Sequence, residues 1–133
     1  MSFSIELLPD EPILHLVWNE DFSVKEEAEE NIHQIRELLD AATEPVFFIH
    51  DMRFVHLTLD DIIIGANATG RGEAPVFQHP NIREVVFISE SKLLELGARG
   101  MKSATFGNVN IKVFKTPEEA LAHIRTTIAE GQG

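Results

Sequence analysis

The sequence predicts a single α/β domain with a mixed, mostly parallel sheet flanked by helices, and three observations support this fold class. Residues 46–49 form a continuous apolar run without alternation, as in a strand that is covered on both faces. Residues 85–88 form a second run of this kind. Helical patterns follow both runs, and strand–helix–strand units with right-handed crossovers build parallel sheets. The predicted order over residues 1–133 is β-β-α-β-α-β-α-β-α.

An antiparallel hairpin is predicted at the start of the chain. Residues 3–8 alternate apolar and polar, residues 9–12 supply turn residues, and residues 13–18 form the return strand. Ser23 then begins a long helix, with Glu26 three positions later in the pattern of a capping box. One apolar stripe marks the buried side of this helix, made of Val24, Ala28, Ile32, Ile35, Leu38, Leu39 and Ala42.

A second helix is predicted to begin at Thr58, just after the central strand. Asp61 follows three positions later and completes a capping box, while Leu57 and Ile62 occupy the positions of a hydrophobic staple. The remaining elements follow in turn. They are an irregular loop over residues 69–81, a strand over 85–88, a helix from Ser89 or Ser91, a strand over 111–114 and a last helix capped by Thr116.

Composition and charge exclude several classes of function. The chain has 22 acidic and 11 basic residues and a formal charge of −11, so its average surface repels phosphate backbones and anionic lipid headgroups. The absence of cysteine excludes a disulfide framework and thiol chemistry. The sequence shows no basic segment followed by an apolar core at its start and no apolar run as long as a membrane span. We therefore expect a cytoplasmic protein that binds neither nucleic acid nor membrane.

Two segments carry a resemblance to a known family. Residues 47–55, FFIHDMRFV, are similar to an apolar family strand that ends in an aspartate and then turns to a valine. Residues 114–121, FKTPEEAL, are similar to the family's closing strand and capped helix. With the order and spacing of the other elements, the chain resembles the STAS domain of SpoIIAA-like anti-sigma-factor antagonists, and more closely the divergent SpoIIAA-like bacterial proteins of STAS/SEC14 type. The resemblance covers nearly the whole chain and implies a SpoIIAA-like fold and a regulatory role through protein binding.

The resemblance also bears on the start of the second helix. In the antagonists, a serine in an Asp-Ser-Ser-Gly type segment is phosphorylated there and controls partner binding. Here the segment reads Thr58-Leu59-Asp60-Asp61-Ile62, so the acceptor serine is absent and Asp60 or Asp61 stands in its place. A carboxylate at this position imitates the phosphorylated state with less charge. Alternatively, and in our preferred interpretation, the acidic residues stabilise the first helical turn by roughly 0.3 to 1 kcal/mol.

Catalytic or metal-binding chemistry is the weaker hypothesis. His50 and Asp51 adjoin at the end of the central strand, and His56 and His79 are further candidates. Adjacent strand residues point to opposite faces, so His50 and Asp51 do not readily serve one site. No pair has a metal-ligand spacing such as His-Glu-x-x-His, and we expect no metal and no cofactor. We expect Asp51 to cap its turn and His50 to lie under a helix, and an enzyme using His50, Asp51 or His79 ranks third.

Two functions of different classes rank higher. The first is a non-enzymatic regulatory module that binds a protein partner with a basic surface, or a second copy of itself, through the start of the second helix and the following loop. The second is a domain for a small apolar ligand or lipid, with Phe77, Ile63 and Trp18 as pocket wall. Gly70-Arg71-Gly72 lacks the lysine and the placement of a phosphate-binding loop. The candidate contact residues are Asp51, His56, Thr58, Asp60, Asp61 and Arg71.

Overall fold

Five strands form one sheet in the computed structural model of the chain, which describes residues 2–72, 75–103 and 109–131. The strands lie side by side in chain order, β1-β2-β3-β4-β5. β1 and β2 pair antiparallel, and the other neighbouring pairs are parallel, which confirms the predicted mixed sheet. Their bounds are Phe3–Leu7, Ile13–Trp18, Val46–Asp51, Ile82–Ile88 and Ile111–Phe114.

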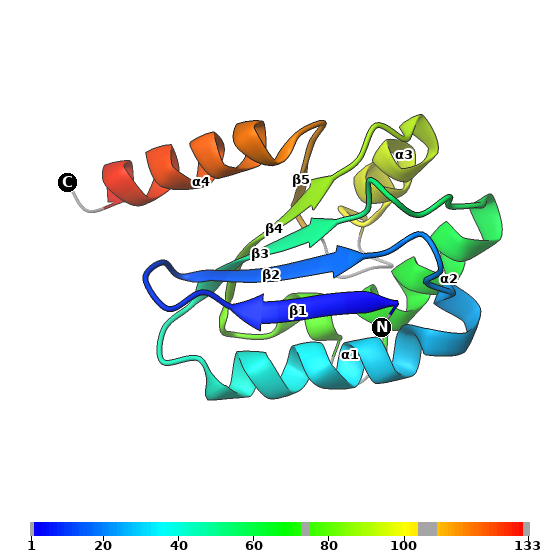
Figure 1. Cartoon of the computed structure of the whole chain (residues 1–133), viewed down its shortest axis with the longest axis horizontal. Coiled ribbons are helices and arrows are strands. Elements are labelled where there is room, and N and C mark those ends of the chain that lie inside the picture. The colour runs from blue at the N-terminus through cyan, green and yellow to red at the C-terminus, as the bar shows by residue number, and fades with distance from the viewer. Residues whose placement is uncertain (1, 73–74, 104–108, 132–133) are drawn as a thin grey trace.

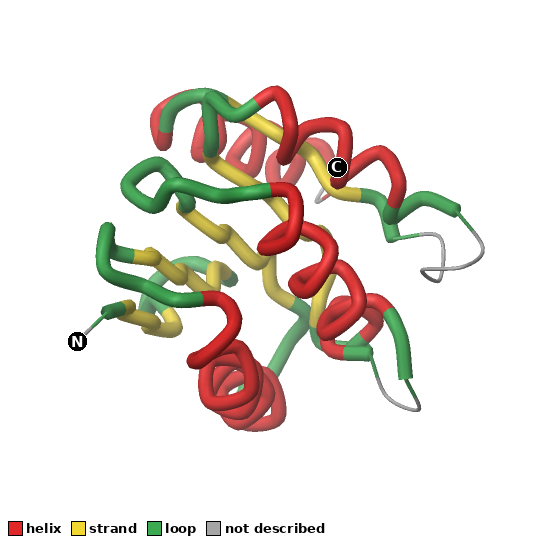
Figure 2. The backbone as a smooth tube through the Cα atoms, turned by 90° about the vertical axis from the view of Figure 1, so that its right-hand side faces the viewer, coloured by secondary structure: helices red, strands yellow, loops and turns green. Residues whose placement is uncertain are grey.

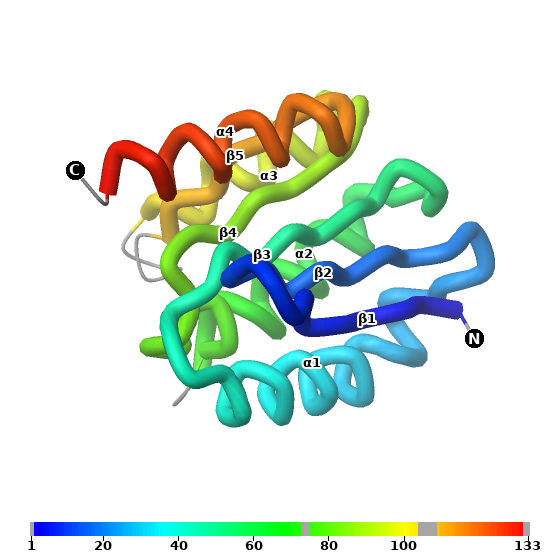
Figure 3. Tube along the Cα trace, turned by 60° about the vertical axis from the view of Figure 1, so that its left-hand side comes forward, coloured from blue at the N-terminus to red at the C-terminus, as the bar shows by residue number. Residues whose placement is uncertain are grey.

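Helices cover the sheet on both faces, with three on one side and one on the other (Figures 1 and 2). The crossovers between neighbouring parallel strands have the same hand, so the three connecting helices lie on the same face. These are α1 (Val24–Ala41), α2 (Leu59–Gly70) and α3 (Lys92–Gly100). The last helix, α4 (Pro117–Gly131), follows the last strand and packs on the opposite face. Figure 3 shows α1 running beside the edge strand β1.

β3 is the central strand, as the apolar run predicts, and all six of its residues are buried. Its side chains alternate between the two layers. Phe48 belongs to the core beneath α1, α2 and α3, while Phe47 and Ile49 pack with Ala120 and Ile124 of α4. A helical layer covers each face of β3, which explains why its residues on both faces are mostly apolar.

α1 begins as predicted, but its capping box is closed by a different glutamate. The Ser23 hydroxyl accepts a hydrogen bond from the backbone N–H of Glu26 at 3.4 Å. The reciprocal bond goes from the backbone N–H of Ser23 to the Glu27 carboxylate at 2.7 Å, so the assignment of this role to Glu26 is wrong. Glu27 also accepts a hydrogen bond from the Ser2 hydroxyl, and these two bonds hold its pKa below the ordinary value.

The segment between α2 and β4 is more regular than the predicted loop over residues 69–81. Thr69 and Gly70 belong to α2, and a 3₁₀ turn, η1, spans Val76–Gln78; residues 73–74 lie outside the described residues. β4 begins at Ile82 rather than at residue 85. Residues 82–84 are only half-buried or exposed, so they lack the apolar run that marks the covered part of the strand. In the described part of the chain, no helix is both long and apolar enough to cross a membrane.

Candidate functional site

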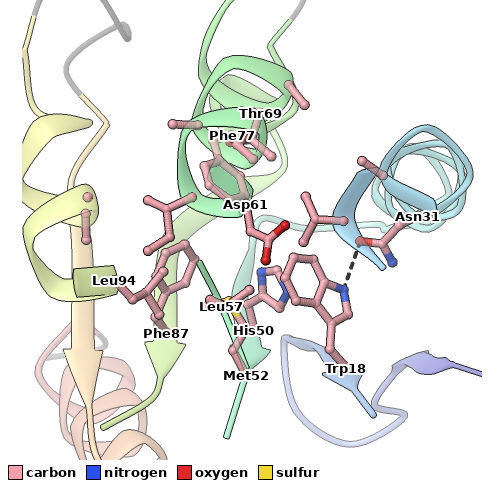
Figure 4. A pocket seen from close by; sticks show the side chains of 18 of the residues that line it. Trp18, Asn31, His50, Met52, Leu57, Asp61, Thr69, Phe77, Phe87 and Leu94 are labelled. Atoms are coloured by element: carbon pink, nitrogen blue, oxygen red, sulfur yellow. Dashed lines mark hydrogen bonds between the residues drawn. The ribbon is translucent and has the colours of Figure 1, made fainter. Parts of the chain in front are cut away.

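A small cavity of about 70 Å³ lies between the sheet and the helices α1, α2 and α3 (Figure 4). We call it the α2 cavity. Its walls are mostly apolar and include Trp18 at the end of β2, Met52 just after β3 and Phe87 near the end of β4. Apart from Trp18, the polar side chains in its lining are Asn31, His50, Asp61 and Thr69. The cavity thus lies near the carboxyl ends of the strands, where open α/β sheets usually bind ligands.

His50 is the buried polar residue that β3 contributes to the α2 cavity. Its ring lies 4.2 Å from the Trp18 ring and 5.5 Å from the Phe87 ring, both nearly perpendicular, and 5.8 Å from the parallel Phe48 ring. Burial lowers the pKa of His50 from 6.5 to about 3, an effect that the charge of Asp51 opposes only in part. The imidazole is therefore neutral at pH 7, with one donor and one acceptor nitrogen. Neither nitrogen has a hydrogen-bond partner among the described residues.

Asn31 is a second buried polar residue of the cavity wall, and Trp18 lies between it and His50 (Figure 4). The indole N–H of Trp18 donates to the Asn31 side-chain oxygen at 3.2 Å. Because an indole N–H can only donate, this bond fixes which way the Asn31 amide points. The amide nitrogen of Asn31 is left without a partner in the part of the chain that the structure describes. Asn31 was not singled out from the sequence because it is polar, although its spacing, three residues after Ala28 and four before Ile35, places it on the buried side of α1.

Asp61 lies at the start of α2 and points its carboxylate into the α2 cavity (Figure 4). It also closes the predicted capping box with Thr58. The Thr58 backbone N–H donates to Asp61 Oδ2 at 3.0 Å, and the Asp61 backbone N–H donates to the Thr58 hydroxyl at 3.2 Å. Leu57 and Ile62 pack on the core as a staple. The capping-box prediction is confirmed, and Asp61 has a structural role at the helix start.

Asp51 lies on the opposite face of the sheet from His50, as strand alternation predicts. Its carboxylate accepts the backbone N–H of Arg53 at 3.1 Å, which confirms the predicted turn cap. The sequence did not identify the partner that completes this arrangement. The Arg53 guanidinium also binds both Asp51 oxygens, at 2.8 to 3.1 Å, and this pairing raises the pKa of Arg53.

The six candidate contact residues do not form one site. His56, Thr58 and Asp60 are exposed and follow one another before and within the first turn of α2, with half-buried Asp61 next to them. Asp51 is buried with Arg53 on the other face. Arg71 follows the last residue of α2, roughly 20 Å from Thr58 at 1.5 Å per helical residue.

The histidines proposed for catalysis do not converge either. His79 Nε2 lies 2.7 Å from Asp40 Oδ1 near the end of α1, and its other ring nitrogen accepts from the Asn81 N–H. His79 and His56 are not part of the cavity lining. Among the described residues, no group of three His, Cys, Asp or Glu side chains has a geometry that could hold a metal ion. The predicted wall residues Trp18 and Phe77 do line the cavity, whereas Ile63 points to solvent, so that prediction is wrong for Ile63.

Large exposed apolar side chains lie on α2, on α3 and on the turn before α2. In the described part of the chain, five large apolar residues are exposed by 37 to 60%, and we call them the apolar patch residues. α2 and α3 pack side by side. Sequence periodicity did not single these residues out, because an apolar residue on a helix is usually read as core. The apolar patch residues are Phe54, Leu59, Ile63, Leu93 and Leu96.

Comparison with known proteins bears on the fold. No family model and no curated protein matches the chain. A solved structure of an uncharacterized protein of the DUF3478 family with a SpoIIAA-like fold, from Shewanella loihica PV-4, is similar to it. The TM-score is 0.54 at 17% sequence identity, and the match covers 90% of each chain. The chain therefore has a SpoIIAA-like fold, as the two sequence segments implied.

Proposed function

We propose that this chain is a non-enzymatic regulatory module that binds a protein partner through the start of α2 and the neighbouring surface of α3. The observation that carries the proposal is the placement of the apolar patch residues. Large exposed apolar groups on a folded domain mark interaction sites when they gather in one region, whereas single ones are ordinary. Here all five lie on two adjacent helices and the turn before one of them, at the region that the family resemblance indicates.

Charged side chains of both signs stand beside the apolar patch residues. Asp60 is exposed next to Leu59 and Glu90 near Leu93, while Lys92 and Arg99 are exposed on α3 and Arg99 pairs with Glu95 at 3.5 Å. An apolar centre with a charged rim is typical of protein interfaces. Because the whole chain carries a formal charge of −11, a partner with basic residues around an apolar contact is favoured.

No serine occupies the first turn of α2, so in our proposal partner binding is not controlled by serine phosphorylation there. Asp61 is engaged in the capping box, which leaves Asp60 as the exposed carboxylate at this position. Asp60 then contributes a fixed charge to the contact surface.

Site-specific crosslinking tests the proposed surface. A photo-crosslinking amino acid is placed at Leu59 in one variant and at Glu30 in another, which is exposed on α1. In cells that produce the chain naturally, we expect an adduct with a defined protein from position 59 and none from position 30. The captured protein should then bind the purified chain and lose affinity for Leu59→Ser. An adduct with a second copy of the chain would identify the patch as a homodimer contact, and equal labelling from both positions would contradict the proposal.

A small-ligand function is the second candidate, and the α2 cavity favours it. The cavity is apolar, lies near the strand ends and holds two buried side chains with unpaired polar atoms. Pockets of this composition bind small molecules when a few polar groups orient the ligand. NMR titration of the purified protein with small neutral compounds tests it: binding that the cavity-filling variant Ala66→Leu removes supports the ligand function, and binding that persists in that variant contradicts it.

A further inference from the structure

We infer that the α2 cavity takes a small uncharged ligand with a hydroxyl or carboxamide at one end and a hydrocarbon body, placed so that the polar end meets His50. This inference rests on the second candidate function and specifies its ligand. It follows from the hydrogen-bonding needs of the buried polar atoms, from the charges around the cavity, and from its size.

The buried polar atoms favour a ligand group that can both donate and accept hydrogen bonds. Neutral His50 presents one N–H and one bare nitrogen, and Asn31 presents an amide N–H, all without protein partners in the described chain. A buried polar group without a partner is unfavourable. A hydroxyl or a carboxamide can meet either nitrogen of His50, whichever one carries the proton. Trp18 lies between His50 and Asn31 (Figure 4). The polar end of the ligand therefore needs to contact only His50.

The cost of removing an ion from water disfavours a charged ligand in this apolar cavity. None of the described residues that line it is Lys or Arg, and Asp61 presents a carboxylate. A fatty acid or a phosphorylated lipid would bring a second negative charge into an apolar wall without a counter-charge. Asp61 attracts an ammonium and offsets part of its desolvation cost, but an ammonium has only donors and cannot accept a hydrogen bond from the N–H of His50. The ligand is therefore uncharged, which sets it apart from anionic lipids.

Small residues of α2 leave room for the cavity, and the volume of the cavity limits the size of the ligand. Gly65, Ala66 and Ala68 form this part of the wall, and only Gly70 of α2 is fully buried. A cavity of about 70 Å³ is roughly half the size of an engineered cavity that binds benzene. It therefore suits a ligand of about four or five non-hydrogen atoms.

Four matched probes test this inference on the full chain: propan-1-ol, propionamide, propionate and propylammonium. Ligands of this size bind in the millimolar range at best, so each is titrated to about 100 mM. Binding is followed by the NMR signals of the Trp18 indole N–H and the Asn31 side-chain amide. We expect the two neutral probes to bind about tenfold more tightly than the two ions, because each ion must be desolvated in an apolar cavity, and propionate is in addition repelled by Asp61.

Three variants complete the test. His50→Leu should weaken propan-1-ol binding about tenfold, because the hydroxyl loses its hydrogen-bond partner. Ala66→Leu fills the cavity and should abolish binding, whereas His33→Leu, at an exposed site on α1, should change nothing. Thermal unfolding confirms that each variant is folded. If a variant does not fold, the comparison of the four probes on the unmodified chain still tests the inference.

The outcomes separate this inference from the function on which it rests. If no probe shifts the Trp18 signal, both the ligand function and the inference are overturned. If probes bind and Ala66→Leu blocks them, but propionate or propylammonium binds as tightly as propan-1-ol, the cavity binds ligands and only the uncharged class is wrong. If His50→Leu binds propan-1-ol as tightly as the unmodified chain, the role given to His50 is wrong.

Discussion

His50 is buried beneath the helices on one face of the sheet, and Asp51 lies on the other face. Neither ring nitrogen of His50 has a hydrogen-bond partner among the described residues. The ring is surrounded instead by the aromatic side chains of Trp18, Phe48 and Phe87. A protonated imidazole is therefore unfavourable at this position.

The low pKa of His50 makes the stability of the fold depend on pH. The folded pKa is about 3 and the ordinary value is 6.5, so between these values the unfolded chain binds a proton that the folded chain excludes. This contribution to the free energy of unfolding is complete above pH 6.5 and falls by about 1.4 kcal/mol per pH unit as the pH is lowered below it. We expect His50→Leu to lose this dependence.

Urea unfolding at pH 7, 6 and 5 measures the effect as the difference between the wild type and the variant. His50→Leu should gain stability relative to the wild type as the pH falls, while exposed His33→Leu should track the wild type. Parallel pH profiles for the wild type and His50→Leu would show that folding does not lower the pKa of His50.

Among the elements, the sequence predicted best those features that depend only on residues close together in the chain. The caps at Thr58 and Thr116 follow from residue types three positions apart, and both are present. η1 and the first residues of β4 were missed, because their form depends on packing against distant segments. The close approach of α2 and α3 was missed for the same reason.

The cap at Thr58 should be needed for α2, a helix with little buried surface. Replacing Thr58 by Ala removes the acceptor for the Asp61 N–H and is expected to lower the free energy of unfolding by about 1 kcal/mol. Chemical denaturation measures this change. Thr43→Ala, at an exposed position between α1 and β3, is the control and should cost much less. An equal loss in both variants would mean that the cap contributes nothing beyond ordinary surface effects.

Two glycines in neighbouring helices should respond in opposite directions to the same substitution. A Cβ added at Gly65 meets nothing within 4 Å, so Gly65→Ala should stabilise α2 by about 0.5 to 1 kcal/mol. A Cβ at Gly97 would lie 2.6 Å from Cγ2 of Ile62, so Gly97→Ala should push α2 and α3 apart and destabilise the protein by about 1 to 3 kcal/mol. Thermal or denaturant unfolding of the pair measures both, and changes of the same sign would contradict this packing.

At the scale of the whole molecule, the alternation of strands and helices predicted the sheet, and the common hand of crossovers explains why α1, α2 and α3 share a face. The α2 cavity was predicted in part: Trp18 and Phe77, named from the sequence as pocket wall, do line it, whereas the small residues of α2 and Phe87, which come from distant parts of the chain, were not predicted. The apolar patch residues likewise became visible only when α2 and α3 were seen together.

The net charge of −11 separates the two proposed binding events by their response to salt. Association with a basic partner should slow several-fold between about 50 and 500 mM salt, because screening removes long-range attraction. Stopped-flow mixing of the chain with the partner that crosslinking identifies measures this association rate. Binding of uncharged propan-1-ol to the α2 cavity serves as the internal control and should stay nearly constant. A partner rate without salt dependence would argue against electrostatic attraction.

The strand order described above also bears on how the protein is made. Each strand of the sheet lies next to the one synthesised just before it, from β1 to β5. A chain emerging from the ribosome can therefore extend its sheet one strand at a time, with no gap left for a later segment to fill. α4 then arrives last and covers the opposite face of a sheet that is already assembled.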